Sequence, residues 1–114
     1  MKLNEIIQKA DLKEIYCYDK KTDIVNGYIG DLLSDVMGNA PEDSIWLTIQ
    51  SHVNIIAVAS IRDIKAVVLC NDLEFDEETI KKAKENNISL LSSKYSAFKT
   101  VLNLFKAGFE TSEI

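Results

Sequence analysis

The run Lys65-Ala66-Val67-Val68-Leu69-Cys70 is continuous and apolar, and the predicted fold is built around it. An apolar run without polar alternation is typical of a strand in a parallel sheet that is covered on both faces. A dense strand-like run, Ser44-Ile45-Trp46-Leu47-Thr48-Ile49, precedes it, and a shorter one, Ile88-Ser89-Leu90-Leu91-Ser92, follows it. These three runs predict the centre of a β-sheet.

Helices are predicted between these strands. Residues 53–61 are apolar nearly all round, which fits either a second buried strand or a buried helix. The length of the segment 51–63 favours the helix, because parallel strands need a crossover of about a dozen residues. The run Phe75-Asp76-Glu77-Glu78-Thr79-Ile80 predicts a second helix that begins with Asp76 as its N-cap and extends to about Glu85.

A final helix is predicted to begin at Ser92 or Ser93 and to end at Gly108, a residue suited to a left-handed C-terminal position. Its predicted buried face consists of the apolar side chains at helical spacing: Tyr95, Phe98, Val101, Leu102 and Phe105. From residue 44 onward, strands and helices therefore alternate. This order predicts an α/β fold, a three-layer sandwich in which helices flank a mostly parallel sheet.

Residues 1–43 add a short opening helix and one or two edge strands, at 14–18 and 24–30. Gly27 and Gly30 in the second run indicate a bend, a bulge or a close backbone approach. Asp31 is predicted to cap a short helix that follows. The chain has no internal repeat, low-complexity segment or linker, so residues 1–114 are expected to form a single domain.

The composition argues against several partners. The chain has 114 residues, of which 46% are hydrophobic, and its 13 basic and 18 acidic side chains give a net charge of −5. Arg62 is the only arginine, so a nucleic-acid partner is not expected. Because the chain lacks the apolar run of a membrane span or a signal peptide, we expect no membrane partner and a cytoplasmic location.

No metal or cofactor is expected from the sequence. Cys17 and Cys70 lie far apart in separate strand-like runs, as small buried thiols usually do, and they form no zinc motif with the single histidine. Asp31 and Asp35 are four residues apart, a spacing that is typical of a solvated helix face rather than of a divalent-cation site.

Ligands of an open parallel sheet gather at the carboxyl ends of the strands, beside the N-termini of helices. Three such junctions are predicted, at residues 50–54, 70–72 and 92–96. Their polar side chains are predicted to converge on one weakly charged pocket: Gln50, Ser51, His52, Asn54, Asn71, Ser92, Ser93 and Ser96. Such a pocket suits a small polar or phosphorylated ligand.

Five of these residues also have a purely structural interpretation: Ser51, His52, Asn71, Ser92 and Ser93. Serines at strand-to-helix turns cap helices, His52 can sit at a helix start with no chemical role, and Asn71 followed by Asp72 fits a turn. The chain contains no nucleophile elbow and no phosphate-binding glycine loop, so it is not predicted to be an enzyme. Any acid–base or phosphoryl-relay hypothesis starts with His52. The scarcity of arginine and glycine motifs also argues against tight binding of a nucleotide polyphosphate.

Four segments of the chain resemble the DRTGG domain family, whose members are similar to the N-terminal domain of HPr kinase/phosphorylase and also occur fused to CBS-domain proteins and phosphate acetyltransferases. They are GYIGDLLSDV (27–36), WLTIQSHVNI (46–55), AVVLCNDLE (66–74) and ISLLSSKYSAF (88–98). Relatives commonly carry Thr-Gly-Gly where this chain has Cys70-Asn71-Asp72. The resemblance implies an α/β sandwich and a regulatory or sensing role, often as a dimer. The family has no assigned catalytic function.

The function expected from the sequence is therefore a non-catalytic regulatory module that senses a ligand or binds another protein, as a homodimer. The alternative is a structural partner or scaffold for a larger enzyme or kinase, without a small-molecule ligand. Such a scaffold needs an exposed apolar patch, for which Trp46, Tyr28 and Met37 are the candidates. The same three residues also suit core packing.

Overall fold

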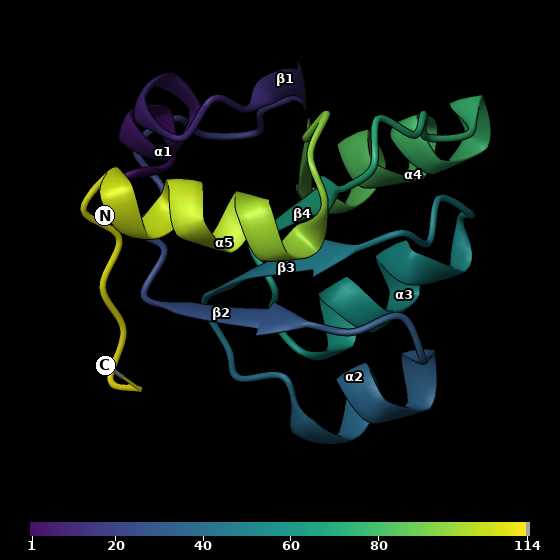
Figure 1. The fold of residues 1–114 in the computed structure, drawn as a ribbon. Helices are drawn as coiled ribbons and strands as arrows, with labels where there is room; N and C mark the ends of the chain where they lie inside the picture. Colours follow the sequence, from purple (N-terminus) through teal and green to yellow (C-terminus); the bar gives the residue numbers. More distant parts are fainter. Residues whose placement is uncertain (114) are drawn as a thin grey trace.

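The computed structural model describes residues 1–113 and contains a five-stranded sheet with helices on both faces (Figure 1). The strands are β1 (Lys13–Tyr16), β2 (Asn26–Ile29), β3 (Ser44–Thr48), β4 (Ala66–Leu69) and β5 (Ser89–Ser92). The helices are α1 (Leu3–Lys9), α2 (Leu33–Asn39), α3 (Asn54–Ile61), α4 (Glu77–Asn86) and α5 (Ala97–Lys106). The strand order is β1-β5-β4-β3-β2, with β1 antiparallel to β5 and the other neighbours parallel. The predicted α/β fold with a mostly parallel sheet is confirmed.

Side chains alternate between the two faces of the sheet and build two cores. Trp46, Val67 and Leu90 pack in one core with residues of α2, α3 and α4. Ile45 and Val68 pack in the other core with residues of α1 and α5. The helices accordingly form two outer layers, and α5 crosses the front of the sheet in Figure 1.

Trp46 belongs to the core and not to an exposed patch. Its side chain is fully buried, and its indole N–H donates a hydrogen bond to the carbonyl oxygen of Gly30 at 2.8 Å. Tyr28 and Met37 are half-buried and pack against the same core. A Cβ atom at Gly30 would lie 3.2 Å from a Val36 side-chain carbon and 3.3 Å from a Tyr28 ring carbon, so neighbouring side chains, and not another backbone, approach this glycine closely.

The predicted buried face of the last helix is wrong. Phe98 is 75% exposed and Phe105 is 59% exposed, whereas Thr100 and Leu104 are buried beneath α5. Helical periodicity identifies an apolar face but not the surface that covers it. Here the helix packs on the sheet side through a face that includes small residues, and its large apolar side chains point outward.

The N-terminal end of α5 differs from the prediction, and the C-terminal end agrees with it. The helix begins with Ser96 as its N-cap, whose hydroxyl accepts a hydrogen bond from the Lys99 amide, and not with Ser92 or Ser93. The predicted left-handed residue at the C-terminal end is confirmed, because Gly108 has a φ of +98°. The amides of Gly108 and Phe109 donate back to carbonyls of the last turn, which completes a Schellman ending.

Two acids have structural roles that the sequence did not predict. Asp31 does not cap α2; instead its carboxylate accepts hydrogen bonds from the Thr48 hydroxyl and the Ile49 amide, both at 2.9 Å. Asp35 accepts the Tyr28 hydroxyl at 2.7 Å, and this bond raises the pKa of the phenol. Asp31 is exposed and Asp35 is half-buried, so both carboxylates remain in contact with solvent while they join β2 or its end to neighbouring elements.

The two cysteines differ in burial. Cys70 is buried as predicted, whereas Cys17 is only half-buried, beyond the end of β1. Partial or full removal from water raises the pKa of both thiols above the ordinary value. Neither thiol is thereby activated as a nucleophile at neutral pH.

Candidate functional site at the strand ends

The predicted junctions follow three adjacent strands of the sheet. Thr48 at the end of β3 is paired with Leu69 at the end of β4, and Leu69 is paired with Ser92 at the end of β5. The parallel orientation therefore brings residues 50–54, 70–72 and 92–96 to one edge, as the prediction required.

Gln50 and Ser51 hold loops together at this edge. The Gln50 side-chain amide donates to the Asp31 carbonyl at 2.9 Å. The Ser51 carbonyl accepts the Thr79 hydroxyl at 2.8 Å, which attaches the end of β3 to the first turn of α4. Asn54 is exposed at the first position of α3.

His52 forms a pair with Asp76 that the sequence did not predict. Its Nδ1 lies 2.7 Å from the Asp76 carboxylate, and the two side chains are 71% and 49% exposed. Asp76 occupies the predicted N-cap position of α4, but its carboxylate bonds to His52 rather than to a helix amide. Among residues 1–113 no serine, threonine or cysteine side chain bonds to this imidazole, so the pair lacks the nucleophile of a catalytic triad.

The turn after β4 has an unusual backbone. Asn71 and Asp72 have φ values of +65° and +58°, the left-handed region that glycine adopts most easily and that Asn and Asp tolerate next best. The Asn71 amide donates to the Tyr95 carbonyl at 2.8 Å, and the Asp72 amide donates to the Ser93 carbonyl at 3.0 Å. These bonds attach the turn to the segment between β5 and α5.

This backbone leads to a prediction for Asn71. We expect Asn71→Gly to raise the free energy of unfolding by up to about 1 kcal/mol, because glycine removes the steric cost of the left-handed conformation. The matched control is Asn103→Gly in the interior of α5, which is expected to lower it by about 0.3 kcal/mol, because glycine is a poorer helix former than asparagine. Urea denaturation followed by circular dichroism measures the free energy of unfolding of both variants. A lower value for Asn71→Gly than for the wild type would contradict the left-handed conformation of Asn71.

The three serines at the end of β5 have different environments. Ser93 is buried, with its hydroxyl 2.7 Å from that of Thr100, and Ser96 caps α5. Ser92 lines a cavity of about 280 Å³ at the strand ends. The residues around this cavity are Asp11, Leu12, Lys13, Asp72, Ser92 and Lys94.

This cavity contains charged residues that the sequence-based prediction omitted. Lys13 begins β1, which pairs antiparallel with β5 and so places its first residue opposite Ser92. The order of residues in the chain does not reveal that this early strand lies beside the last one. Of the eight predicted site residues, Ser92 lines this cavity, and the structure distributes the others along the same edge.

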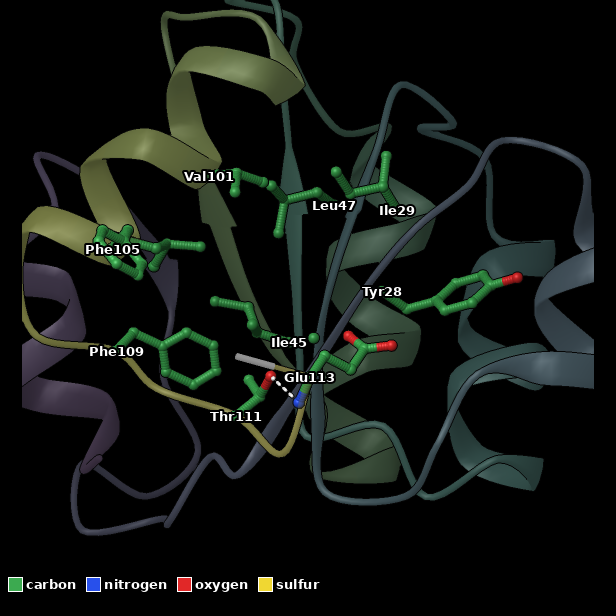
Figure 2. Close-up of a pocket in the computed structure, with 11 residues that line it drawn as sticks. Tyr28, Ile29, Ile45, Leu47, Val101, Phe105, Phe109, Thr111 and Glu113 are labelled. Atoms are coloured by element: carbon green, nitrogen blue, oxygen red, sulfur yellow. Dashed lines mark hydrogen bonds between the residues drawn. The ribbon is translucent and has the colours of Figure 1, made fainter.

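A second, larger cavity lies on the α5 face of the sheet, away from the predicted site. It is an apolar groove of about 420 Å³. Figure 2 shows Val101, Phe105 and Phe109 on one side of this groove and Ile29, Ile45 and Leu47 on the other. The sequence-based prediction missed it because it placed Val101 and Phe105 on the buried side of their helix.

Residues 1–113 contain neither a membrane-spanning helix nor a metal-binding cluster. No helix in this part of the chain combines the length and the apolarity that crossing a bilayer requires. Within the same residues, no three His, Cys, Asp or Glu side chains come together in an arrangement that holds a metal ion.

The chain is a small α/β domain in which the polar loops after β3, β4 and β5 meet at one edge of the sheet. The chain belongs to the DRTGG domain family, whose pattern matches residues 36–107. No curated protein matches the sequence significantly.

A similar solved structure is the crystal structure of the CBS and DRTGG domains of the regulatory region of Clostridium perfringens pyrophosphatase, complexed with its activator diadenosine tetraphosphate. The TM-score is 0.76 at 14% sequence identity, and the alignment covers 93% of this chain. It covers 46% of that chain, so this protein spans about half of the length of its structural neighbour. At this identity the likeness shows the fold.

Proposed function

We propose that this chain is a non-catalytic regulatory domain, active in the cytoplasm as a homodimer, that senses a small polar or phosphorylated ligand. The observation that carries the proposal is the strand-end cavity beside Ser92, which lies at the edge where open α/β sheets bind ligands. Support for a regulatory role comes from membership of the DRTGG family and from the regulatory region that shares its fold.

The side chains around the cavity determine which ligand chemistry fits it. Lys13 and Lys94 supply two positive charges for a phosphate or carboxylate. Hydroxyl or amino groups of a ligand can donate hydrogen bonds to Asp11, Asp72 and Ser92. The Ser92 hydroxyl can also act as a donor. Because the acids balance the lysines, the cavity favours a monophosphate with hydroxyl groups over a polyphosphate. The remaining predicted residues stay predictions of additional contacts along the same edge: Gln50, Ser51, His52, Asn54, Asn71, Ser93 and Ser96.

A thermal-shift screen tests this ligand class. The probes are AMP, acetyl phosphate, a hexose phosphate and diadenosine tetraphosphate, the last because it activates the structural neighbour. A probe at about 100 times its dissociation constant is expected to stabilise the fold by about 2.7 kcal/mol. Ser92→Ala and Lys13→Gln are expected to reduce the shift, and Lys9→Gln on α1 is the matched control. The absence of a shift with every probe would contradict the proposal.

The alternative function is a structural partner of a larger enzyme or kinase. The observation that favours it is the exposed apolar face of α5, which exceeds the scattered apolar residues of an ordinary surface. Light scattering on the isolated chain discriminates between the alternatives. A monomer without any ligand response favours the scaffold, and a dimer that responds to a probe favours the regulatory module.

A further inference from the structure

The outer face of α5 carries a stripe of large apolar side chains. We define the α5 stripe as Phe98, Val101, Leu102 and Phe105, which are 75%, 38%, 46% and 59% exposed. The polar Thr100 is buried on the opposite side of the same helix. A helix of a monomeric protein normally turns its apolar stripe toward the core. This stripe therefore indicates a surface that another molecule covers.

The apolar groove runs directly beside the stripe. Val101 and Phe105 belong to both, and Ile29 on the edge strand β2 forms the opposite wall, where it is 50% exposed (Figure 2). Phe109 and Leu47 line the groove as well. Each copy of the chain therefore has protruding apolar side chains beside an apolar groove that can receive them. A surface that associates with a second copy of itself needs such self-complementarity.

The order of residues in the stripe is symmetric. Residues 98–105 read Phe-Lys-Thr-Val-Leu-Asn-Leu-Phe, so Phe98 and Phe105 are equally distant from the midpoint between Val101 and Leu102. An antiparallel pair of α5 helices with a two-fold axis at this midpoint places Phe98 of one copy opposite Phe105 of the other. A two-fold interface needs such a self-complementary patch, because each copy contributes the same surface.

The charges around the stripe favour the same antiparallel arrangement. Lys94 and Lys99 lie toward its N-terminal end, whereas Lys106, Glu110 and Glu113 lie toward its C-terminal end and make that end acidic on balance; all five are exposed. Antiparallel pairing brings the basic end of one copy to the acidic end of the other, and it also aligns the two helix dipoles favourably. A parallel pair would juxtapose like charges.

We propose that a second copy of this chain covers the α5 stripe and the groove, with the two α5 helices antiparallel across a two-fold axis. Phe98 of each copy then lies at the mouth of the groove of the other, beside Phe105. Because Val101 and Phe105 belong to both the stripe and the groove, the second copy covers the two together. The inference rests on the homodimer of the proposed function and assigns its surface.

Light scattering coupled to size exclusion tests the surface. The chain is expected to be a dimer at concentrations of about 10 µM, and Phe98→Glu or Leu102→Glu is expected to weaken dimerisation about 100-fold while leaving the circular dichroism of the fold unchanged. Ile61→Glu is the matched control, because Ile61 is 69% exposed on α3 and lies outside the stripe and groove. A wild-type monomer, or a Phe98→Glu variant that still dimerises, would overturn the inference.

A charge exchange tests the orientation. In the antiparallel pair, the double variant Phe98→Glu/Phe105→Lys places each glutamate opposite a lysine of the other copy, so dimerisation is expected to recover relative to Phe98→Glu. In a parallel pair the same variant sets like charges against each other, and failure to recover would contradict the orientation. The ligand screen is repeated on the wild-type chain under the conditions of the light scattering. A wild-type monomer that still responds to a ligand refutes this inference and the homodimer but leaves the ligand proposal standing, and a dimer without a response refutes only the ligand proposal.

Discussion

Trp46→Ala is expected to lower the free energy of unfolding by about 4 kcal/mol, one of the largest effects of a single substitution in this chain. The side chain is fully buried at the centre of the core that the sheet shares with α2, α3 and α4, so its loss removes apolar burial and leaves a cavity. Its indole N–H also bonds to the Gly30 carbonyl, which would lose its donor. Urea denaturation followed by circular dichroism gives the value.

Trp46→Phe is the variant to measure if Trp46→Ala does not fold. It retains most of the apolar volume but leaves the Gly30 carbonyl without its indole donor, so we expect a smaller loss of about 1–3 kcal/mol. A loss of less than about 1 kcal/mol for Trp46→Ala would place the indole at the surface, as the patch interpretation requires.

The second large effect concerns the face of α5 that is buried. Leu104→Ala is expected to lower the free energy of unfolding by about 3 kcal/mol, because Leu104 is only 4% exposed and packs in the core with α1. Leu102→Ala, two residues away in the same helix, is expected to change it by less than about 0.5 kcal/mol, because Leu102 is 46% exposed.

Both variants are measured in the Phe98→Glu background, so that dimerisation does not add to the stability of either. The reverse order, with Leu102→Ala more costly than Leu104→Ala, would restore the helix orientation predicted from the sequence. It would also remove the basis of the α5 interface.

Local patterns were sufficient to predict most of the fold. The three central strands, the crossover helix at 54–61, the start of α4 after Asp76 and the left-handed Gly108 all follow from features within a few residues of each position. The alternation of strands and helices then predicted the parallel sheet. The predicted and observed elements agree because residue propensity, apolar periodicity and the residues at helix ends all favour the same local structure in these segments.

What the sequence did not predict depends on contacts between distant segments. The place of β1 beside β5 added Lys13 and Asp11 to the strand-end cavity, and nothing in the order of the chain indicates that pairing. The carboxylate of Asp31 does not bond to a helix amide. It accepts hydrogen bonds from the Thr48 hydroxyl and the Ile49 amide at the end of β3 instead. The outward apolar face of α5 has the periodicity of a buried face, and only the folded structure distinguishes the two.

The most direct test of the central claim is an NMR titration of the 15N-labelled chain with AMP and with diadenosine tetraphosphate. The proposed function predicts that at least one probe shifts amide signals at residues 11–13, 71–72 and 92–94, around the strand-end cavity. Signals of groove residues such as Ile29 and Phe105 are expected to stay in place. Shifts confined to the groove, or no shifts with either probe, would contradict ligand sensing at the strand ends.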